Sequence, residues 1–230
     1  LFYMDERAIV TLDGVTLING AGYEGGAIYN LGDLTITHST FSHNIAEIGG
    51  GAVYNLGDVS ISHSLFTHNI GMYGGAIFNL HTMSISTSAF FDNVGLFSAG
   101  AIDNAETLTI RNSLFYRNNA KGLGGAIANS QTISINHAQF GDNTALAYGG
   151  ALFSNGEARL RNSIFTHNIT LEGGAIFASG NRVTNTMSIQ NTMFNYNVAI
   201  FSGGALYNDY KNTTTLMDSL FAHNVAPVGG

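Results

Sequence analysis

Short segments of alternating apolar and polar residues recur along the chain at nearly constant spacing. Five of them read LTIT at 34–37, VSIS at 59–62, MSIS at 83–86, LTIR at 108–111 and ISIN at 133–136. Two-residue alternation rich in β-branched residues indicates a strand with one buried and one solvated face. No stretch shows the 3.6-residue apolar periodicity of an amphipathic helix. The pattern therefore predicts an all-β protein.

Two further landmarks keep step with these strands. Gly-Gly-Ala begins at Gly25, Gly50, Gly74, Gly124, Gly149, Gly173 and Gly203, with Ala99-Gly100-Ala101 filling the gap. A Phe followed three residues later by Asn also recurs once per period. The Phe residues are Phe41, Phe66, Phe90, Phe115, Phe140, Phe165, Phe194 and Phe221, and the Asn residues are Asn44, Asn69, Asn93, Asn118, Asn143, Asn168, Asn197 and Asn224. A period of about 25 residues without helices is typical of a β-solenoid.

The period predicts a parallel β-solenoid of about nine coils with three short strands per coil, stacked about 4.8 Å apart. We expect the Phe residues to form a buried column and the Asn residues a hydrogen-bonded ladder, since stacked coils place equivalent side chains above one another. Residues 1–230 are expected to be a single repeat domain with loop insertions near 179–186 and 209–215. The chain starts and stops in mid-pattern, so we expect a processed or partial segment of a longer surface protein.

The repeat motifs resemble those of a known family. GGAIYN, GGAVYN, GGAIFN and GGALYN, alternating with FSHN, FTHN and FYRN, resemble the GGA(I/L/V) and FxxN repeats of the chlamydial polymorphic membrane proteins. The pattern is also similar to that of large bacterial surface proteins with right-handed parallel β-helix repeats. The resemblance implies a right-handed β-helix on a cell surface, often as an adhesin or autotransporter passenger. It places the chain outside the cell, as a secreted bacterial protein.

Composition narrows the classes of partner. The net charge is −7 and only eight residues are Lys or Arg, which argues against nucleic acid, because phosphate binding needs clustered cations. The chain contains no Cys, so no disulfide framework is expected. No apolar run approaches the ~18 residues needed to span a bilayer. We therefore expect no transmembrane segment in this chain.

The acidic residues do not form a recognisable catalytic set. Most of the 15 carboxylates occur singly, about one per coil, whereas glycoside hydrolysis needs a pair at fixed separation. Asp33 and Asp58 recur in successive LGD turns, a position that favours turn capping over ion binding. We therefore expect no enzyme activity, no catalytic residue and no cofactor. A carbohydrate-active β-helix remains a minor alternative.

Two pairs of histidines are candidate metal ligands. His38 and His43 lie one coil before His63 and His68, so stacking would place each pair about 4.8 Å apart. Two neutral imidazoles that close could share a metal ion. The same repeat positions hold other polar residues elsewhere, namely Asp92, Arg117, Asn112, Asn162 and Tyr196. This variation favours a solvent-facing turn and leaves metal binding by either pair open.

Two rows of apolar residues are candidate interfaces. The first follows Gly-Gly-Ala and comprises Tyr29, Tyr54, Phe78, Phe153, Phe177 and Tyr207. The second lies between each FxxN motif and the next Gly pair and includes Met72, Tyr73, Leu96, Phe97, Tyr148, Ile200 and Phe201. Adjacent apolar residues in a strand cannot all point inward, and exposed apolar patches mark contact surfaces. The alternative is that one or both rows belong to the core.

These features favour a non-enzymatic extracellular structural protein, a β-helix rod that self-associates into a filament, stalk or surface layer. Joining two copies head to tail leaves 26 residues between Gly229 and the next Gly25, close to the ordinary spacing. We therefore expect a homo-oligomer that associates head to tail, with lateral association as a second mode. The alternative is a cell-surface adhesin or autotransporter passenger that binds a host protein or glycan.

Overall fold

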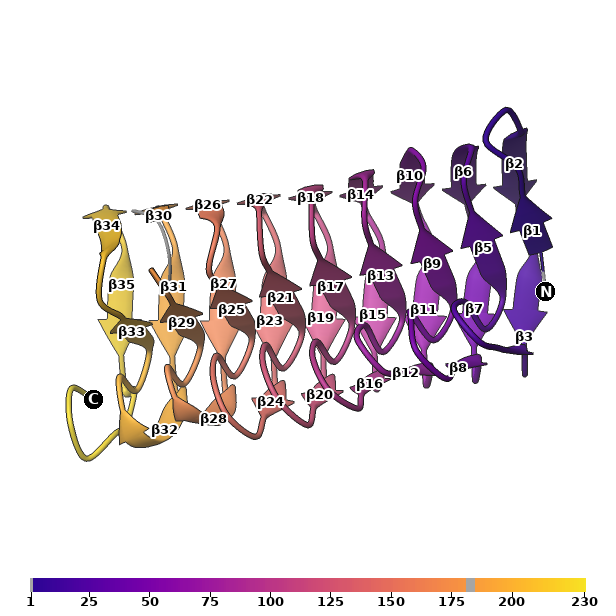
Figure 1. Cartoon of the computed structure of the whole chain (residues 1–230). Coiled ribbons are helices and arrows are strands. Elements are labelled where there is room, and N and C mark those ends of the chain that lie inside the picture. Colours follow the sequence, from indigo (N-terminus) through magenta and orange to yellow (C-terminus); the bar gives the residue numbers. More distant parts are fainter. Residues whose placement is uncertain (1, 181–184) are drawn as a thin grey trace.

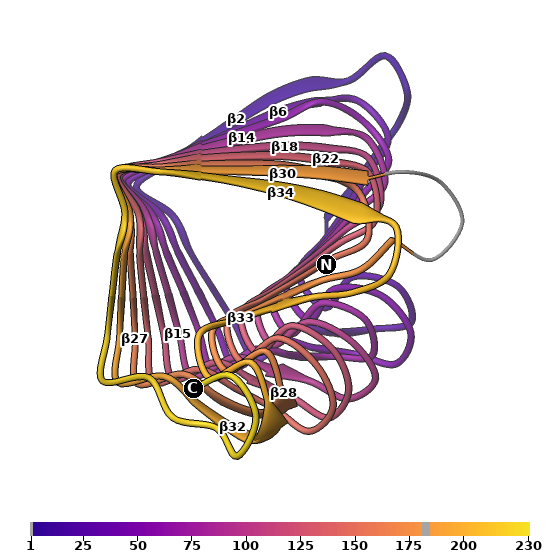
Figure 2. The same cartoon turned by 90° about the vertical axis from the view of Figure 1, so that its left-hand side faces the viewer.

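The computed structural model describes residues 2–180 and 185–230, which wind into a nine-coil β-helix without an α-helix (Figure 1). The strands of these residues form four sheets, here A to D in their order along each coil. Every strand pairs in parallel with the equivalent strand of the next coil, as in β5 (Ile28–Asn30) with β9 (Val53–Asn55). The view along the rod in Figure 2 shows sheets B, C and A as three sides of the section, with D at a lower corner. The fold class predicted from the repeat is confirmed.

Sheets A and B have nine strands each. Sheet A comprises β1 (Phe2–Met4), β5 (Ile28–Asn30), β9 (Val53–Asn55), β13 (Ile77–Asn79), β17 (Ile102–Asn104), β21 (Ile127–Asn129), β25 (Leu152–Ser154), β29 (Ile176–Ala178) and β33 (Leu206–Asn208). Sheet B comprises β2 (Ile9–Asp13), β6 (Asp33–Thr37), β10 (Val59–Ser62), β14 (Thr82–Ser86), β18 (Thr107–Arg111), β22 (Thr132–Asn136), β26 (Glu157–Arg161), β30 (Asn185–Gln190) and β34 (Asn212–Met217).

Sheet C also has nine strands and sheet D has eight, within the described residues. Sheet C comprises β3 (Thr16–Ile18), β7 (Thr40–Ser42), β11 (Leu65–Thr67), β15 (Ala89–Phe91), β19 (Leu114–Tyr116), β23 (Gln139–Gly141), β27 (Ile164–Thr166), β31 (Met193–Asn195) and β35 (Leu220–Ala222). Sheet D comprises β4 (Ala21–Gly22), β8 (Ile45–Ala46), β12 (Ile70–Gly71), β16 (Val94–Gly95), β20 (Asn119–Ala120), β24 (Thr144–Ala145), β28 (Ile169–Glu172) and β32 (Val198–Ser202).

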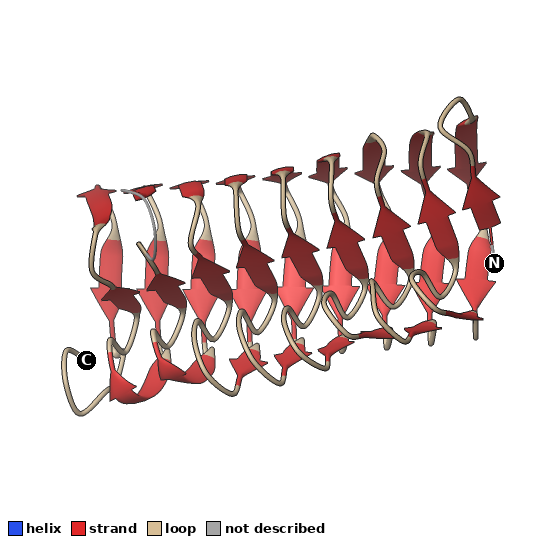
Figure 3. Cartoon of the chain, in the orientation of Figure 1, coloured by secondary structure: helices blue, strands red, loops and turns tan. Residues whose placement is uncertain are grey.

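Sheet D is a fourth strand per coil, where the sequence predicted three. Most of its strands are two residues long, as in β12, and follow directly after the Asn of FxxN (Figure 3). Two residues span only one period of alternation, so the apolar pattern carries no strand signal there. The strand forms because the backbone remains extended after the Asn corner and pairs with the neighbouring coil.

The core consists of columns of identical or similar side chains. Successive rings of the Phe column, from Phe41 to Phe221, lie 4.6–5.0 Å apart and nearly parallel. An aliphatic column from sheet B lies in the same core and includes Ile36, Ile61 and Ile85. Burial of each such side chain stabilises the fold by roughly 2–3 kcal/mol before entropic costs. The repeat therefore builds one continuous core.

Buried polar side chains join the coils at their corners. Nδ2 of Asn44 donates to Oδ1 of Asn69 at 3.0 Å, and the same oxygen accepts the backbone N–H of Asn44. A column of hydroxyl groups runs beside it, in which the backbone N–H of Ser39 donates to Oγ of Ser64 at 3.1 Å. These bonds satisfy groups that would otherwise be buried without partners.

A second Asn ladder, absent from the predictions made from the sequence, ends five consecutive strands of sheet A, β5, β9, β13, β17 and β21. Nδ2 of Asn30 donates to Oδ1 of Asn55 at 2.8 Å, and Asn79, Asn104 and Asn129 continue the ladder. Each of the first two side chains also binds the backbone of the tight turn that follows it. The sequence feature that indicates this ladder is the Asn at the end of GGAIYN, GGAVYN and GGAIFN, which recurs once per coil from Asn30 to Asn129.

The corner after sheet D requires glycine. A Cβ atom added at Gly75 would lie 1.9 Å from the carbonyl oxygen of Gly100 in the next coil. No rotamer change removes a clash with backbone, so the second Gly of Gly-Gly-Ala leaves no room for a side chain between successive coils.

The two predicted insertions adjoin strands. Residues 181–184, within the first, lie outside the described residues. Asn185 begins β30 and Asn212 begins β34, and the two residues pair with each other. Residues 212–215 of the second insertion therefore lie in a strand of sheet B, where a loop was predicted.

Candidate functional site

The paired histidines occupy turn positions with a left-handed backbone. φ is 47° for His38, 49° for His63, 56° for His43 and 55° for His68, and all four side chains are exposed. Their rings stack in pairs, 5.1 Å apart for His38 and His63 and 5.0 Å for His43 and His68. Every residue at these two repeat positions in the other coils also has positive φ. Turn geometry therefore explains the residue choice, since His, Asn and Asp tolerate this conformation best.

A metal centre needs more ligands than these pairs supply. Residues 2–180 and 185–230 contain no group of three His, Cys, Asp or Glu side chains placed to hold a metal ion. His38 instead contacts Asp13, with Nδ1 3.0 Å from Oδ1. Hydrogen bonds from Thr37 and His38 lower the pKa of Asp13. These are contacts of a solvated surface.

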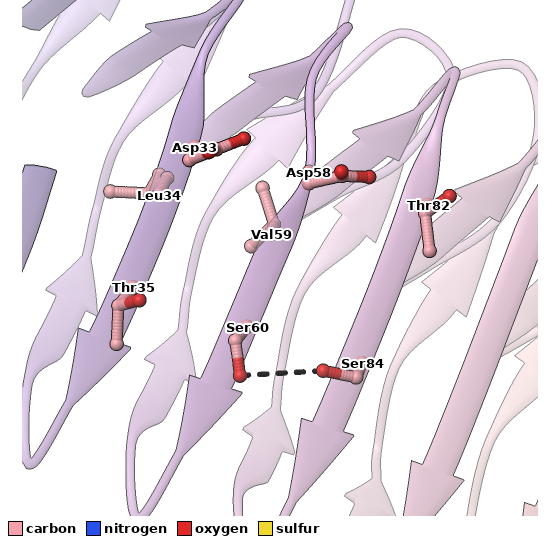
Figure 4. Close-up of a pocket in the computed structure, with 8 residues that line it drawn as sticks. All are labelled: Asp33, Leu34, Thr35, Asp58, Val59, Ser60, Thr82 and Ser84. Atoms are coloured by element: carbon pink, nitrogen blue, oxygen red, sulfur yellow. Dashed lines mark hydrogen bonds between the residues drawn. The ribbon is translucent and has the colours of Figure 1, made fainter. Parts of the chain in front are cut away.

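The stacked acids Asp33 and Asp58 lie on the solvated face of sheet B. Figure 4 shows them at the start of neighbouring strands, beside a shallow hollow of about 340 Å³ that Ser60 and Ser84 also line. Oγ of Ser84 donates to Oγ of Ser60 at 3.3 Å, and Nδ1 of His81 lies 3.0 Å from Oδ1 of Asp58. The arrangement offers hydrogen-bonding groups on an open surface without enclosing a ligand.

The first predicted row lies on the outer face of sheet A, and we call it the aromatic row. It consists of the central residue of each sheet A strand, in the aligned order Tyr3, Tyr29, Tyr54, Phe78, Asp103, Ala128, Phe153, Phe177 and Tyr207. The rings of Tyr29 and Tyr54 stack with centroids 5.3 Å apart. In the strands from β5 to β29 the residues on either side of the central one are buried, so the row faces outward.

The second predicted row projects beside sheet A, and we call it the loop edge. It consists of the residues between the Asn of each FxxN motif and the next Gly pair. Tyr73 stacks on Phe78 at 5.0 Å, and Tyr148 packs against Phe177 at 4.5 Å. The loop edge thereby covers part of the aromatic row, and Phe177 is only 6% exposed. Burial is also the main cause of the raised pKa of Tyr54.

The loop edge itself is the more exposed of the two rows. Leu96 and Phe97 are 51% and 60% exposed, and Ile200 and Phe201 are similarly open to solvent. Figure 2 shows these loops bulging from the section beside sheet A. Exposed apolar side chains on several coils of one edge form the kind of patch that marks a contact surface.

The aromatic row is interrupted at Asp103 and Ala128, and a hollow of about 400 Å³ opens there. Phe78 and Phe153 bound the hollow along the row, and residues of the loop edge complete it, namely Tyr73, Phe97, Ser98 and Leu123. Asp103 is 8% exposed, and burial raises the pKa of its carboxyl to about 6, while Ser98 beside it acts in the opposite direction. The hollow therefore combines aromatic walls with one buried carboxyl group.

In the sequence, Asp103 is one of the isolated acidic residues, and the aromatic hollow around it was not predicted. The signal was the alignment of AGAIDN with GGAIFN, which places Asp103 at the position of Phe78. Its burial depends on the path of the preceding loop, which no local pattern reports.

A sequence model described as a right handed beta helix region matches residues 2–165. The chain belongs to this family. No curated protein and no solved structure matches it significantly. Membership of the right-handed β-helix family establishes the fold, and function must be argued from the surface of this chain. In the described part of this β-helix, no helix is long and apolar enough to cross a bilayer.

Proposed function

We propose that this β-helix is a non-enzymatic extracellular structural protein, a rod that self-associates side to side through its loop edge. The observation that carries the proposal is the exposed apolar surface of Met72, Leu96 and Phe97 on successive coils. Charged residues make up only 10% of the chain, so little charge opposes association. The resemblance to polymorphic membrane proteins supports a location on a cell surface.

The charges that flank this patch favour a second copy as the partner. Four successive coils place Glu47, Met72, Leu96 and Lys121 at one aligned position of the loop edge. Both charged side chains are exposed, and neither belongs to an ion pair within residues 2–180 and 185–230. The order is acid, apolar, apolar, base.

This order is self-complementary in an antiparallel pair. A two-fold axis between Met72 and Leu96 would bring each Glu47 beside the second copy's Lys121 and pack the apolar residues together at the centre. Two-fold interfaces use the same patch on both subunits in this reciprocal way. The pairing satisfies both charges and covers the exposed side chains of Met72 and Leu96 at once.

End-to-end packing extends the proposal. Phe221 in the last coil is 39% exposed, whereas its equivalents in the preceding seven coils are fully buried. A further coil, from a second copy or from more of the same polypeptide, would cover this ring. The register of a head-to-tail junction, 26 residues, suits such stacking.

Charge reversal tests the side-to-side interface. We expect the purified rod to form dimers or larger assemblies by light scattering and negative-stain electron microscopy. Glu47→Lys and Lys121→Glu should each weaken association at least about tenfold, because like charges then face each other twice. The double reversal should restore association. A wild-type chain that stays monomeric at high concentration, or a double variant no better than the single ones, would refute the proposal.

A second candidate function is adhesin-like binding of a host protein or glycan, which the hollow at Asp103 favours. Binding of wild-type protein to a protein or glycan array, and its loss in Asp103→Asn, would support this function. Binding that Asp103→Asn leaves unchanged would count against this site.

A further inference from the structure

The rings around the hollow form a corner. Tyr73 lies nearly parallel to Phe78, with an interplanar angle of 22°, and is steeply inclined to Phe97, at 78° with 5.8 Å between ring centroids. Phe153 stands three coils beyond Phe78 on the same row, about 14 Å away by strand spacing. A sugar ring stacks on an open, flat aromatic face, whereas inclined rings surround a compact group.

The carboxyl group of Asp103 has no cationic partner among the described residues. The ion pairs of residues 2–180 and 185–230 use four other carboxylates, those of Asp13, Asp58, Asp92 and Glu157. Tyr73 is the other titratable side chain that lines the hollow. Burying a carboxylate without a counter-ion is costly, so a bound cation would recover more free energy here than at an exposed acid.

We propose that the hollow binds an alkylammonium group, held between the carboxylate of Asp103 and the rings of Tyr73, Phe78 and Phe97. Aromatic faces attract such cations through their quadrupoles, and methyl or methylene groups on the nitrogen fill the apolar space. A hollow of about 400 Å³ accommodates a group of this size. Either a quaternary ammonium compound or the lysine side chain of a protein supplies this chemistry. The proposal deepens the second candidate function. Its site shares Phe97 with the proposed association surface, but neither Glu47 nor Lys121 lines the hollow.

Titration calorimetry with three small probes tests the assignment. Choline represents a quaternary ammonium group, n-butylammonium represents a lysine side chain, and 3,3-dimethylbutan-1-ol is the uncharged counterpart of choline. We expect millimolar or tighter binding of at least one cation and binding at least about tenfold weaker for the alcohol. The tighter of the two cations identifies the source. The absence of cation binding up to 50 mM would overturn the proposal, and so would a measurable affinity for both cations no higher than that for the alcohol.

Variants locate the binding. Asp103→Asn keeps the shape of the side chain and removes its charge, and should weaken cation binding at least about tenfold. Phe78→Leu should weaken it several-fold while keeping an apolar wall. The matched control Asp33→Asn removes an exposed acid on sheet B and should leave binding unchanged. Unaltered affinity in Asp103→Asn, with native circular dichroism, would refute the site.

The Glu47→Lys variant separates this proposal from the proposed rod assembly. If self-association is lost and cation binding persists, cation binding does not require the assembly, even though Phe97 belongs to both surfaces. Failure of the rod proposal would show as monomers that still bind cations, and failure of the present one as assemblies that do not.

Discussion

Asn69 and Asn93 occupy the same corner of successive coils, and Nδ2 of Asn69 donates to Oδ1 of Asn93 at 3.0 Å. The same oxygen accepts the backbone N–H of Asn69 at 3.1 Å, and Nδ2 of Asn93 donates to the carbonyl of Phe66. Both side chains are fully buried. Asn93 also donates its backbone N–H to Oδ1 of Asn118, so one residue joins three coils.

Replacing Asn93 by Ala should lower the free energy of unfolding by about 3 kcal/mol, because it removes the acceptor of the backbone N–H and of one side-chain N–H of Asn69, together with the side-chain donor to the carbonyl of Phe66. Urea unfolding followed by circular dichroism measures the loss. Gln131→Ala, which truncates an exposed polar side chain, should change stability by less than about 0.5 kcal/mol. A loss in Asn93→Ala no larger than in this control would contradict the role of the ladder.

Removal of one ring from the Phe column should be at least as costly. Phe115 is fully buried, with the rings of Phe90 and Phe140 at 4.8 and 4.9 Å. Phe115→Ala leaves a cavity between them and should cost about 3–5 kcal/mol. Phe97→Ala removes the same atoms from an exposed position and should cost much less. Equal midpoints of urea unfolding for the two variants would show that the column is not the core of the rod.

Thr87 is a β-branched residue in a left-handed turn, with φ of 47°, where the aligned residue of the next coil is Asn112. Asn tolerates this conformation better than Thr, so Thr87→Asn should stabilise the protein by about 1 kcal/mol. Differential scanning calorimetry should show a higher melting temperature. Thr109→Asn, in the extended strand β18, should bring no gain, and a lower melting temperature for Thr87→Asn would contradict the explanation given for the histidine positions.

Asp103 should make stability depend on pH. Its pKa is about 6 in the folded state against an ordinary value of 3.8, so between these values the folded state binds more protons than the unfolded state. The contribution of this group to the free energy of unfolding therefore falls as pH rises from about 4 to 6, by roughly 3 kcal/mol. Above pH 6 it stays constant.

The variant Asp103→Asn cannot titrate, so its stability relative to wild type should increase across the same interval. Urea unfolding at pH 4, 5, 6 and 7 measures this difference, and taking the difference removes the titration of other carboxylates. The same difference for Asp33→Asn, an exposed acid, should remain small. A difference for Asp103→Asn that does not vary with pH would mean that its carboxyl group is solvated.

Much of this structure follows from the repeat. In a solenoid the residues of one coil lie directly on their equivalents in the next, so an aligned period predicts which side chains touch between coils. Phe66 above Phe41 and Asn69 above Asn44 could therefore be predicted from spacing. Sheet D could not be predicted, because its strands are too short to alternate. The Asn30 ladder was missed although its spacing is regular from Asn30 to Asn129.

Contacts between residues of the same coil could not be predicted from the repeat spacing. The packing of Tyr73 on Phe78 and the burial of Asp103 depend on how far each loop turns back over sheet A, and the repeat contains no contact information about that path. The same holds for His68, whose role as a turn residue rests on its φ. Because equivalent residues stack, the amino-acid sequence alone determined which side chains lie next to each other along the rod. The cross-section of each coil, and therefore the hollow at Asp103, was decided only by the path of the folded backbone.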